Sequence, residues 1–283
     1  RSDSRPLDEA PTPCAERLTT PLLTRVLAVG GAKGGVGTSM LADNLALYLE
    51  AGLSVIKIGE SARTSLQGFS LAGGARRDLR QSLKRGEREG LTFEIAPREA
   101  TPELLPQLRE ISDEWLSDKN ASEKAFSLGA FSEAFLVHFP IALVRRDGEI
   151  VAFANVVRAG REELAVGLMR SRGSAPPGVM DFLFCNRMRW GSSEGFAWFH
   201  LGMAPLAGLE QHALAPTWNR LGAWLFRHGE HFYNFRGLRA YKEKFSPQWE
   251  PRYIAAPDGL ATSRALLDVA TLISGGLRGL LMR

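Results

Sequence analysis

One stretch near the C-terminal end, residues 234–255, reads NFRGLRAYKEKFSPQWEPRYIA. Its cations are donors suited to phosphate or to a developing oxyanion, and its aromatic rings form rigid walls that lower the local dielectric. The cations are Arg236, Arg239, Lys242, Lys244 and Arg252, the rings are Tyr241, Phe245, Trp249 and Tyr253, and the carboxylates are Glu243 and Glu250. This mixture favours a binding or catalytic site. The alternative is a solvated basic helix over 238–245, followed by a proline-bounded turn and an edge strand.

Outside this stretch, hydrophobic periodicity predicts helices interleaved with short strands. Strands are expected over 53–58, 91–96, 141–145, 150–157, 163–168 and 196–201, and helices over 73–90, 101–116, 132–139, 180–190, 218–227 and 265–282. The Asp147-Gly148 pair between two strand patterns predicts a hairpin turn. This order predicts an α/β (α+β) fold with a mixed, largely antiparallel sheet flanked by helices.

Composition sets wide bounds on function. The chain has 283 residues, of which 45% are hydrophobic and 23% charged, so it can bury the core of one large domain or two small ones. A formal net charge of +4 suits an anionic partner such as tRNA or acidic lipid. The two cysteines and five histidines have no metal-ligand spacing, and we expect neither a metal nor a cofactor.

A basic ridge is predicted on the helix over 73–90. Arg76, Arg80, Lys84 and Arg88 recur every four residues, while Leu79 and Leu83 lie on another face. The ridge is either a contact surface for tRNA phosphates or lipid headgroups, or a solvated helix face, and the pattern leaves both interpretations open.

A glycine-rich segment, GGAKGGVGTS over 30–39, lies between a predicted strand at 25–29 and a predicted helix at 40–50. It resembles the deviant phosphate loop of ParA/MinD-type ATPases, in which Lys33 would be the signature lysine and Ser39 the magnesium-side hydroxyl. Thr38 occupies the position of the phosphate-cradling lysine. The next strand ends in Gly59-Glu60 instead of aspartate, so tight ATP binding is not expected.

Three blocks together carry a second resemblance: EHFYNFRGLRAYKEKFSPQWEPRY at 230–253, PPGVMDFLF at 176–184 and GFAWFHLGMAPLAGL at 195–209. They resemble the aminoacyl-phosphatidylglycerol synthases, the multiple peptide resistance factor family associated with antibiotic resistance. The resemblance runs from about residue 44 to the end. It implies an acetyltransferase-like (GNAT-type) domain that transfers alanine or lysine from aminoacyl-tRNA to phosphatidylglycerol and so changes membrane lipid charge.

The resemblance also implies partners and a location. The partners are aminoacyl-tRNA, phosphatidylglycerol at the membrane surface and, if the chain is a fragment, the membrane-spanning region of the full-length protein. The implied location is the cytoplasmic face of the bacterial inner membrane. No run of 18 apolar residues that would span a bilayer occurs in the sequence.

The resemblance assigns candidate site residues position by position. The catalytic candidates are Arg170 for orienting a carboxylate or phosphate, Lys242 for phosphate or oxyanion contact, and Glu250 for the substrate amino group or proton transfer. The substrate-binding candidates are Asp181, Arg252 and Gly167, and the phosphate-binding candidates are Arg80, Lys84 and Arg88. Relatives commonly have an acidic residue where this chain has Gly167, which predicts weak turnover.

These patterns divide the chain into three parts. Residues 1–24 are expected to be a disordered tail, 25–60 a β-α-β segment that is the remnant of a truncated first lobe, and 61–283 the aminoacyl transfer domain. Two other functions stay open at this point. One is a nucleotide-binding ParA/MinD-like ATPase, and the other is a non-catalytic tRNA- or lipid-binding relic.

Overall fold

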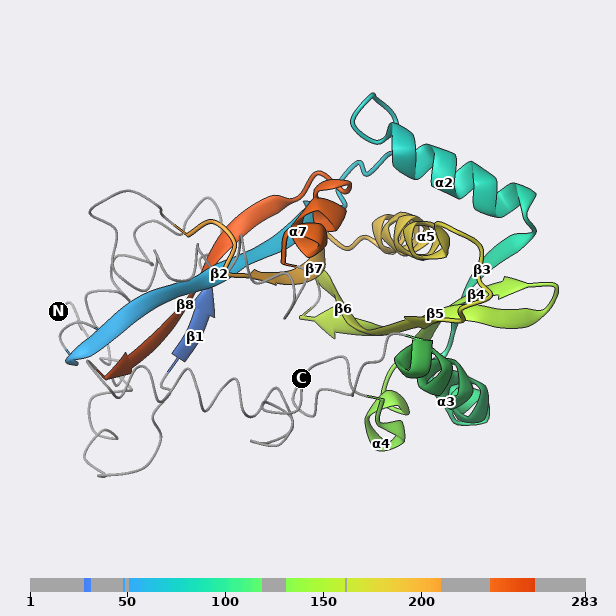
Figure 1. Cartoon of the computed structure of the whole chain (residues 1–283), viewed down its shortest axis with the longest axis horizontal. Helices are drawn as coiled ribbons and strands as arrows, with labels where there is room; N and C mark the ends of the chain where they lie inside the picture. The colour runs from blue at the N-terminus through green and yellow to red at the C-terminus, as the bar shows by residue number, and fades with distance from the viewer. Residues whose placement is uncertain are drawn as a thin grey trace, which may run out of the picture.

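The computed structural model describes residues 28–31, Tyr48, 51–118, 131–160, 162–209 and 235–257. The strands in this part of the chain form one sheet in the order β1-β8-β2-β7-β6-β5-β4-β3 (Figure 1). They are β1 (Ala28–Gly31), β2 (Leu53–Ser65), β3 (Leu91–Ala96), β4 (Ile141–Arg146), β5 (Glu149–Ala159), β6 (Glu163–Ser171), β7 (Trp198–Pro205) and β8 (Gln248–Pro257). The helices are α2 (Arg77–Arg88), the short 3-10 helix η1 (Arg98–Ala100), α3 (Thr101–Asp118), α4 (Glu133–Leu136), α5 (Val179–Ser193) and α7 (Phe235–Glu243).

The neighbouring strands described here pair antiparallel, with β6 and β7 as the parallel exception. The expected fold class, a mixed and largely antiparallel sheet flanked by helices, is therefore confirmed. Several expected segments lie outside the described residues: the tail at 1–24, most of the glycine-rich loop, and the helices at 218–227 and 265–282. Within the helix expected over 40–50, Tyr48 alone is described, and it is helical.

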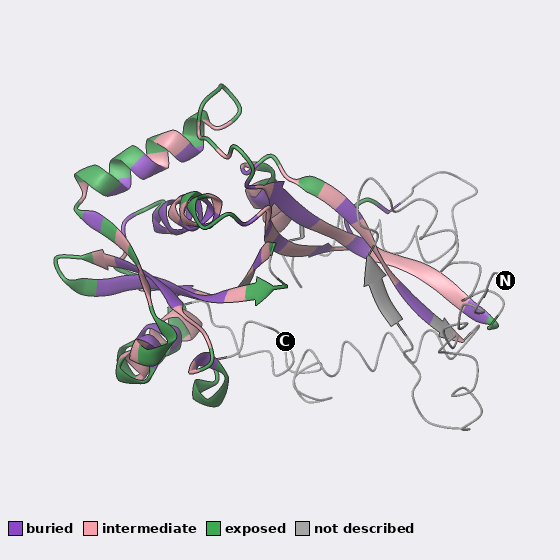
Figure 2. Ribbon diagram, turned by 180° about the vertical axis from the view of Figure 1, so that it is seen from behind, coloured by how far each residue is buried: buried purple, intermediate pink, exposed green. Residues whose placement is uncertain are grey.

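Helices cover both faces of the sheet. Figure 1 shows α2, α5 and α7 on one face and α3 and α4 on the other. The first face holds the larger apolar core, into which Leu79 and Leu83 of α2 pack as the sequence pattern predicts. The second holds a smaller core that includes Leu108 and Ile111 of α3. Figure 2 shows the outer side of α2 exposed, in agreement with its amphipathic pattern.

Strand β2 is twice as long as the sequence predicts. It pairs with β8 along most of its length and with β7 from Gly59 to Ser65. Pairing on both sides satisfies the backbone groups of its polar second half, which no local pattern identified as a strand. At Gly59 the backbones approach so closely that a Cβ atom would lie 2.5 Å from the carbonyl oxygen of Ala204. The boundary expected between residues 60 and 61 thus falls inside a continuous strand.

Strand β8 lies inside the sheet. It pairs with β1 on one side and β2 on the other, so the edge strand in the alternative interpretation of residues 234–255 is not observed. The difference has a physical reason, because edge and interior strands differ in their long-range partners and not in their local pattern. Strand β1 is the edge strand on this side of the sheet.

The β6–β7 junction is a narrow seam between two halves of the sheet. Three residue pairs, from Glu163↔Trp198 to Ala165↔His200, are all that join these strands in the described part of the chain. Helix α5 connects them, as a parallel pair requires. Beyond the third pair the strands separate, as Figure 1 shows.

A buried arginine of α5, Arg187, lies against this seam. Its Nη2 donates to the carbonyl oxygens of Asn155 in β5 (3.1 Å) and Ala165 in β6 (3.2 Å). Its guanidinium carbon lies 5.3 Å from the ring centroid of Phe199 in β7. Burial lowers the pKa of Arg187 to about 10. One side chain of α5 therefore contacts strands on both sides of the seam.

The close contact between α2 and α5 generates a prediction about stability. A Cβ atom on Gly86 would lie 2.5 Å from Cδ2 of Phe182, whose ring is buried. Gly86→Val should therefore destabilise the domain by about 2 kcal/mol, since overpacking a core costs roughly 1–3 kcal/mol. Thermal unfolding should show a melting temperature about 4–8 °C lower.

Gly74→Val is the matched control, because a Cβ atom there meets nothing within 4 Å. It should leave the melting temperature nearly unchanged. Equal shifts for the two variants would contradict the tight α2–α5 contact.

Candidate functional site

The three catalytic candidates are all buried, with Arg170 7%, Lys242 5% and Glu250 7% exposed. Charged side chains are seldom buried unless they are paired or functional, so this shared burial sets the three apart from the surface charges. They come from three elements: β6, α7 and β8. Their hydrogen-bonding and stacking partners differ.

Arg170 lies toward α3. Its guanidinium carbon is 4.2 Å from the ring centroid of Trp115, and Nη1 donates to the carbonyl oxygen of Met169 at 2.8 Å. Stacking on an aromatic face holds the plane of the guanidinium, whose N–H donors lie along its edge. Trp115 also lines the cavity described below, so Arg170 is positioned beside it.

Lys242 lies on the opposite face, where α7 packs on β7. Its Nζ donates to the carbonyl oxygen of Met203 at 2.8 Å. Burial lowers the pKa of Lys242 to about 8, because the charged form loses its hydration. An amine with this pKa is partly neutral near physiological pH and can accept a proton.

Helix α7 is fixed onto the sheet by an ion-pair network. Arg239 donates to Glu60 of β2 at 2.6 Å and stacks on Trp249 of β8 at 4.2 Å. Burial acts to raise the pKa of Glu60, but hydrogen bonds from Arg239 and Lys57 outweigh it and lower that pKa. Phe245, fully buried just after α7, adds an apolar anchor. These contacts hold Lys242 in place.

Glu250 is held between two guanidinium groups. Oε1 lies 2.8 Å from Nη2 of Arg63 in β2, and Oε2 accepts a hydrogen bond from Nη2 of Arg252 at 3.2 Å. The substrate-binding candidate Arg252 is thus brought together with the catalytic candidate Glu250. Sequence reasoning missed Arg63, because it lies beyond the end of the strand predicted at 53–58 and belongs to no motif.

The substrate-binding candidate Asp181 lies in the first turn of α5. Its carboxylate accepts hydrogen bonds from Lys244 (3.0 and 3.3 Å) and from Ser82 Oγ (3.2 Å). Burial and the nearby Asp181 carboxylate raise the pKa of Tyr241, so its hydroxyl stays protonated. Tyr241 in turn packs on the ring of Phe184.

Asp181, Tyr241 and Lys244 line a cavity of about 610 Å³, within the size range of small-molecule sites. Arg170, Lys242 and Glu250 are not among the residues that line it. The cavity lies where the end of β6, the start of α5 and the end of α7 meet. Its walls include Trp115, Asp118, Arg172, Asp181, Tyr241 and Lys244. Acidic, basic and aromatic groups converge here, as the mixture in residues 234–255 predicts for part of this wall.

Gly167 lies at a bulge of β6. The register passes from Ala154↔Met169 to Val156↔Val166, so Asn155 of β5 faces both Gly167 and Leu168. A Cβ atom on Gly167 would lie 2.3 Å from Oδ1 of Asn155, which is fully buried. An acidic side chain at this position would therefore require Asn155 to move.

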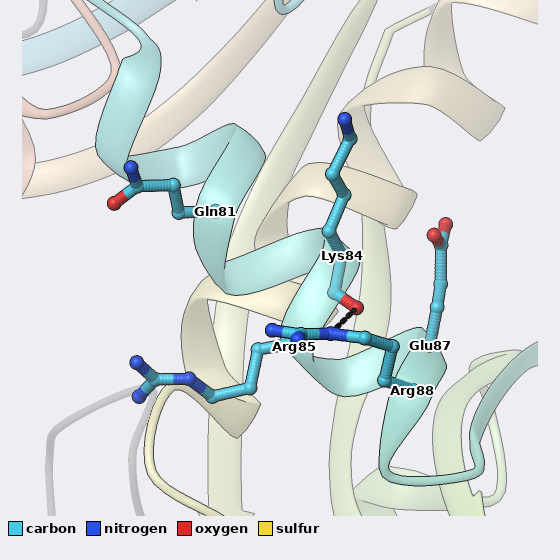
Figure 3. A pocket seen from close by; sticks show the side chains of 5 residues that line it. All are labelled: Gln81, Lys84, Arg85, Glu87 and Arg88. Carbon is cyan, nitrogen blue, oxygen red and sulfur yellow. Dashed lines mark hydrogen bonds between the residues drawn. The ribbon is translucent and has the colours of Figure 1, made fainter.

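The phosphate-binding candidates lie along α2. Nη1 of Arg80 donates to the carbonyl oxygens of Leu71 (2.5 Å) and Gly73 (2.6 Å), so this guanidinium holds the preceding loop. Lys84 and Arg88 are exposed, as is Arg85. Figure 3 shows these three side chains projecting from α2 in different directions. Together with Gln81 and Glu87 they line a hollow of about 810 Å³.

The described residues contain no group of three or more His, Cys, Asp or Glu side chains that could hold a metal ion. Nor does any helix within them have both the length and the apolar character needed to cross a bilayer.

A largely antiparallel sheet flanked by helices, with one parallel β6–α5–β7 unit, agrees with the acetyltransferase-like fold that the resemblance implies. The family model described as "Phosphatidylglycerol lysyltransferase, C-terminal" matches residues 36–256. The chain belongs to this family. The expected resemblance to aminoacyl-phosphatidylglycerol synthases is thereby confirmed.

Individual relatives agree with the family model. The phosphatidylglycerol lysyltransferase of Bacillus subtilis (strain 168) is 41% identical over 234 residues, which cover 82% of this chain and 27% of that protein. The C-terminal domain of a putative lysylphosphatidylglycerol synthetase from Agrobacterium fabrum is 46% identical with a TM-score of 0.70, covering 83% of this chain and 71% of that one. L-PGS from Bacillus licheniformis is 38% identical with a TM-score of 0.71, over 82% and 71% of the two chains. The chain thus spans about a quarter of the length of the curated relative.

The buried amine of Lys242 generates a prediction about stability and pH. The folded state loses this proton near pH 8, whereas an unfolded lysine keeps it to about pH 10.5. Between these values the unfolded chain binds more protons, so the contribution of Lys242 to the free energy of unfolding rises with pH and is smallest below pH 8. Relative to Lys242→Met, the parent should gain up to about 3 kcal/mol from pH 7.5 to pH 10.5.

Urea unfolding of both proteins at half-unit pH steps measures this gain. The comparison with Lys242→Met cancels the titration of the other groups. Parallel pH profiles for the two proteins would contradict a buried amine with a lowered pKa.

Proposed function

We propose that this chain transfers an aminoacyl group, alanyl or lysyl, from aminoacyl-tRNA to the glycerol hydroxyl of phosphatidylglycerol. The observation that carries the proposal is the burial of Arg170, Lys242 and Glu250 within a chain of this family. Relatives that match it bear the name phosphatidylglycerol lysyltransferase, which supports lipid as the acceptor.

The proposed reaction is an ester exchange. The glycerol oxygen bonds to the aminoacyl carbonyl carbon, the bond from that carbon to the tRNA ribose oxygen breaks, and the glycerol proton ends on the ribose oxygen. No oxidant, reductant or further reactant is needed. Because the aminoacyl ester is already activated, the protein has to position two substrates, move one proton and stabilise an oxyanion.

Lys242 suits the proton transfer. Its lowered pKa, about 8, lies close to the operating pH at which a general base works best. As the neutral amine it accepts the glycerol proton, and as the ammonium it stabilises negative charge or donates to the leaving ribose oxygen. This role extends the phosphate or oxyanion contact predicted from the sequence.

Arg170 and Glu250 suit orientation of the substrates. Arg170, stacked on Trp115 beside the cavity, presents donors to a phosphate or to the developing oxyanion. Glu250 is proposed for the substrate amino group or for proton transfer. Arg252, which contacts Glu250 and is partly exposed, is proposed as a phosphate contact.

The cavity beside Asp181 is proposed as the place of the aminoacyl group. Its volume accommodates an amino acid ester, and the rings of Trp115 and Tyr241 supply apolar walls. Asp181 is already bonded to Lys244 and Ser82, so its carboxylate is fixed before the substrate arrives. Preorganised groups of this kind orient a substrate without a further loss of side-chain entropy.

We propose that the reaction takes place at the cytoplasmic face of the bacterial inner membrane and, if the chain is a fragment, beside a membrane-spanning region of the full-length protein. The names of the relatives include a membrane lipid, phosphatidylglycerol, which supports a membrane surface as the place of the reaction. The exposed cations of α2 are suited to phosphates of tRNA or of lipid headgroups. We assign the proposed phosphate contact to Lys84, Arg85 and Arg88, because Arg80 already donates hydrogen bonds to the loop before α2.

The two alternatives differ in what supports them. A ParA/MinD-type phosphate loop follows a strand inside a parallel sheet, whereas β1 is an edge strand antiparallel to β8. This arrangement disfavours the ATPase. A non-catalytic relic is favoured by Gly167 alone, because Asn155 occupies the space of an acidic side chain there.

The test of the proposed function is a transfer assay. The chain is incubated with phosphatidylglycerol vesicles and with labelled lysyl-tRNA or alanyl-tRNA in separate reactions, and labelled lipid is measured. Transfer with at least one tRNA is expected, and Lys242→Met should lower kcat about 100-fold or more. For the parent, kcat/KM should rise with pH until it levels off above about pH 8, where Lys242 is neutral.

No labelled lipid with either tRNA, from a protein that melts cooperatively, would favour the relic. Undiminished transfer by Lys242→Met would remove Lys242 from the mechanism while leaving the activity in place.

A second prediction concerns the helix α2. Replacing Lys84, Arg85 and Arg88 with Gln should weaken tRNA binding and make the plot of log affinity against log salt shallower by about 2–3, roughly the contribution of three phosphate contacts. Fluorescence titration of labelled tRNA at several salt concentrations measures the slope.

Arg98→Gln with Arg146→Gln is the control, because both side chains are exposed on other elements. The control should keep the parent's slope. An unchanged slope for the α2 variant would return that helix to the solvated-face interpretation.

A further inference from the structure

Arg63 of β2 is a buried cation with a defined orientation. It is 4% exposed, and its guanidinium carbon lies 4.0 Å from the ring centroid of Trp198 in β7. On its other side Nη2 lies 2.8 Å from Oε1 of Glu250 in β8. The side chain therefore connects the strands on both sides of β2.

The contact between Arg63 and Glu250 differs from the surface ion pairs of this protein. The side chains of Arg63 and Glu250 are 5% and 10% exposed, whereas those of Arg145 and Glu94, 2.7 Å apart, are 29% and 52% exposed. Water screens the charges of an exposed ion pair, and when one side chain is removed water solvates the charge that remains. In a buried pair, removal of one charge leaves the other without solvent or counterion, so the two groups depend on each other.

Both oxygens of Glu250 are engaged. Arg63 lies at Oε1 and Arg252 donates to Oε2, so two guanidiniums surround one carboxylate. With each oxygen beside a guanidinium, the carboxylate is held in one orientation, which suits it to orienting a substrate group and leaves the moving of a proton to another residue.

We infer that Arg63 is a positioning residue for the proposed aminoacyl transfer: it holds Glu250 as a fixed carboxylate, and Glu250 orients the substrate without carrying the proton. The inference rests on the proposed function and narrows it, because proton transfer then falls to Lys242. Trp198 supports this arrangement, since its ring fixes the guanidinium plane at the strand where β6 and β7 pair.

The test uses the chain with phosphatidylglycerol vesicles and whichever aminoacyl-tRNA it accepts. Arg63→Gln removes the charge and keeps much of the length of the side chain. It should lower kcat about 10- to 100-fold while the KM values for both substrates change less than about twofold. Arg63→Lys restores the charge without the planar fork and should recover part of the loss.

The double variant decides whether Arg63 acts through Glu250. Glu250→Gln alone should lower kcat, and Arg63→Gln combined with Glu250→Gln should lie within about threefold of the more impaired single variant. The rise of kcat/KM toward pH 8 should persist in Glu250→Gln, because Lys242 accounts for it. Arg145→Gln, which breaks the exposed pair, should retain the parent's kcat.

The outcomes are distinct. The inference would be overturned if the loss of kcat in an active, folded double variant equalled the product of the two single losses. It would also be overturned if Glu250→Gln lost the pH dependence of kcat/KM. Either result would leave the proposed function standing. A parent chain inactive with both tRNAs would overturn the proposed function and the catalytic role of this pair with it. Thermal unfolding of every variant separates these results from loss of fold, and equal loss of kcat in Arg145→Gln would show that Arg63 has no special role.

Discussion

The narrow junction of β6 with β7 is the constraint on which the rest of the structure depends. Arg170 belongs to the half of the sheet made of β6, β5, β4 and β3, whereas Lys242 and Glu250 belong to the half made of β7, β2, β8 and β1. Three parallel residue pairs join the halves within the described residues. The relative placement of the proposed catalytic groups therefore depends on a short stretch of backbone pairing.

Helix α5 compensates for the small number of pairs. It packs in the larger apolar core across the junction, and its Arg187 bonds to carbonyl oxygens of β5 and β6 while facing Phe199 of β7. Burying a guanidinium costs several kcal/mol before hydrogen bonds offset it, so an arginine stabilises a core less than an apolar side chain of similar size would. Arg187 does supply hydrogen-bond donors to carbonyl oxygens at the place where the bulge between β5 and β6 and the separation of β6 from β7 interrupt regular strand pairing.

The sequence was informative where structure is decided locally. The alternation in β3, β4 and β5 and the Asp147-Gly148 turn identified these strands within three residues at each end, because a hairpin is specified by its own residues. The polar half of β2 and the interior position of β8 were missed, since partners far along the chain decide them. Resemblance proposed Arg170, Lys242 and Glu250 as site residues, and their described contacts are with other residues: Trp115 for Arg170, Met203 for Lys242, and Arg63 and Arg252 for Glu250. Arg63 had no signal, because a cross-strand ion pair joins residues 187 positions apart without leaving a local pattern.

The order of strands in the sheet also constrains how the chain becomes folded. Strands β3, β4 and β5 follow one another in sequence and in space, so their contacts can form early and locally. Strand β2 precedes them, yet its partners β7 and β8 are made far later on the ribosome. Until β8 emerges, β2 has an unpaired edge exposed to chaperones and to other nascent chains. The pairing of Glu250 with Arg63 can thus form only after β8 has been synthesised, and a chain that ends before β8 lacks this part of the proposed site.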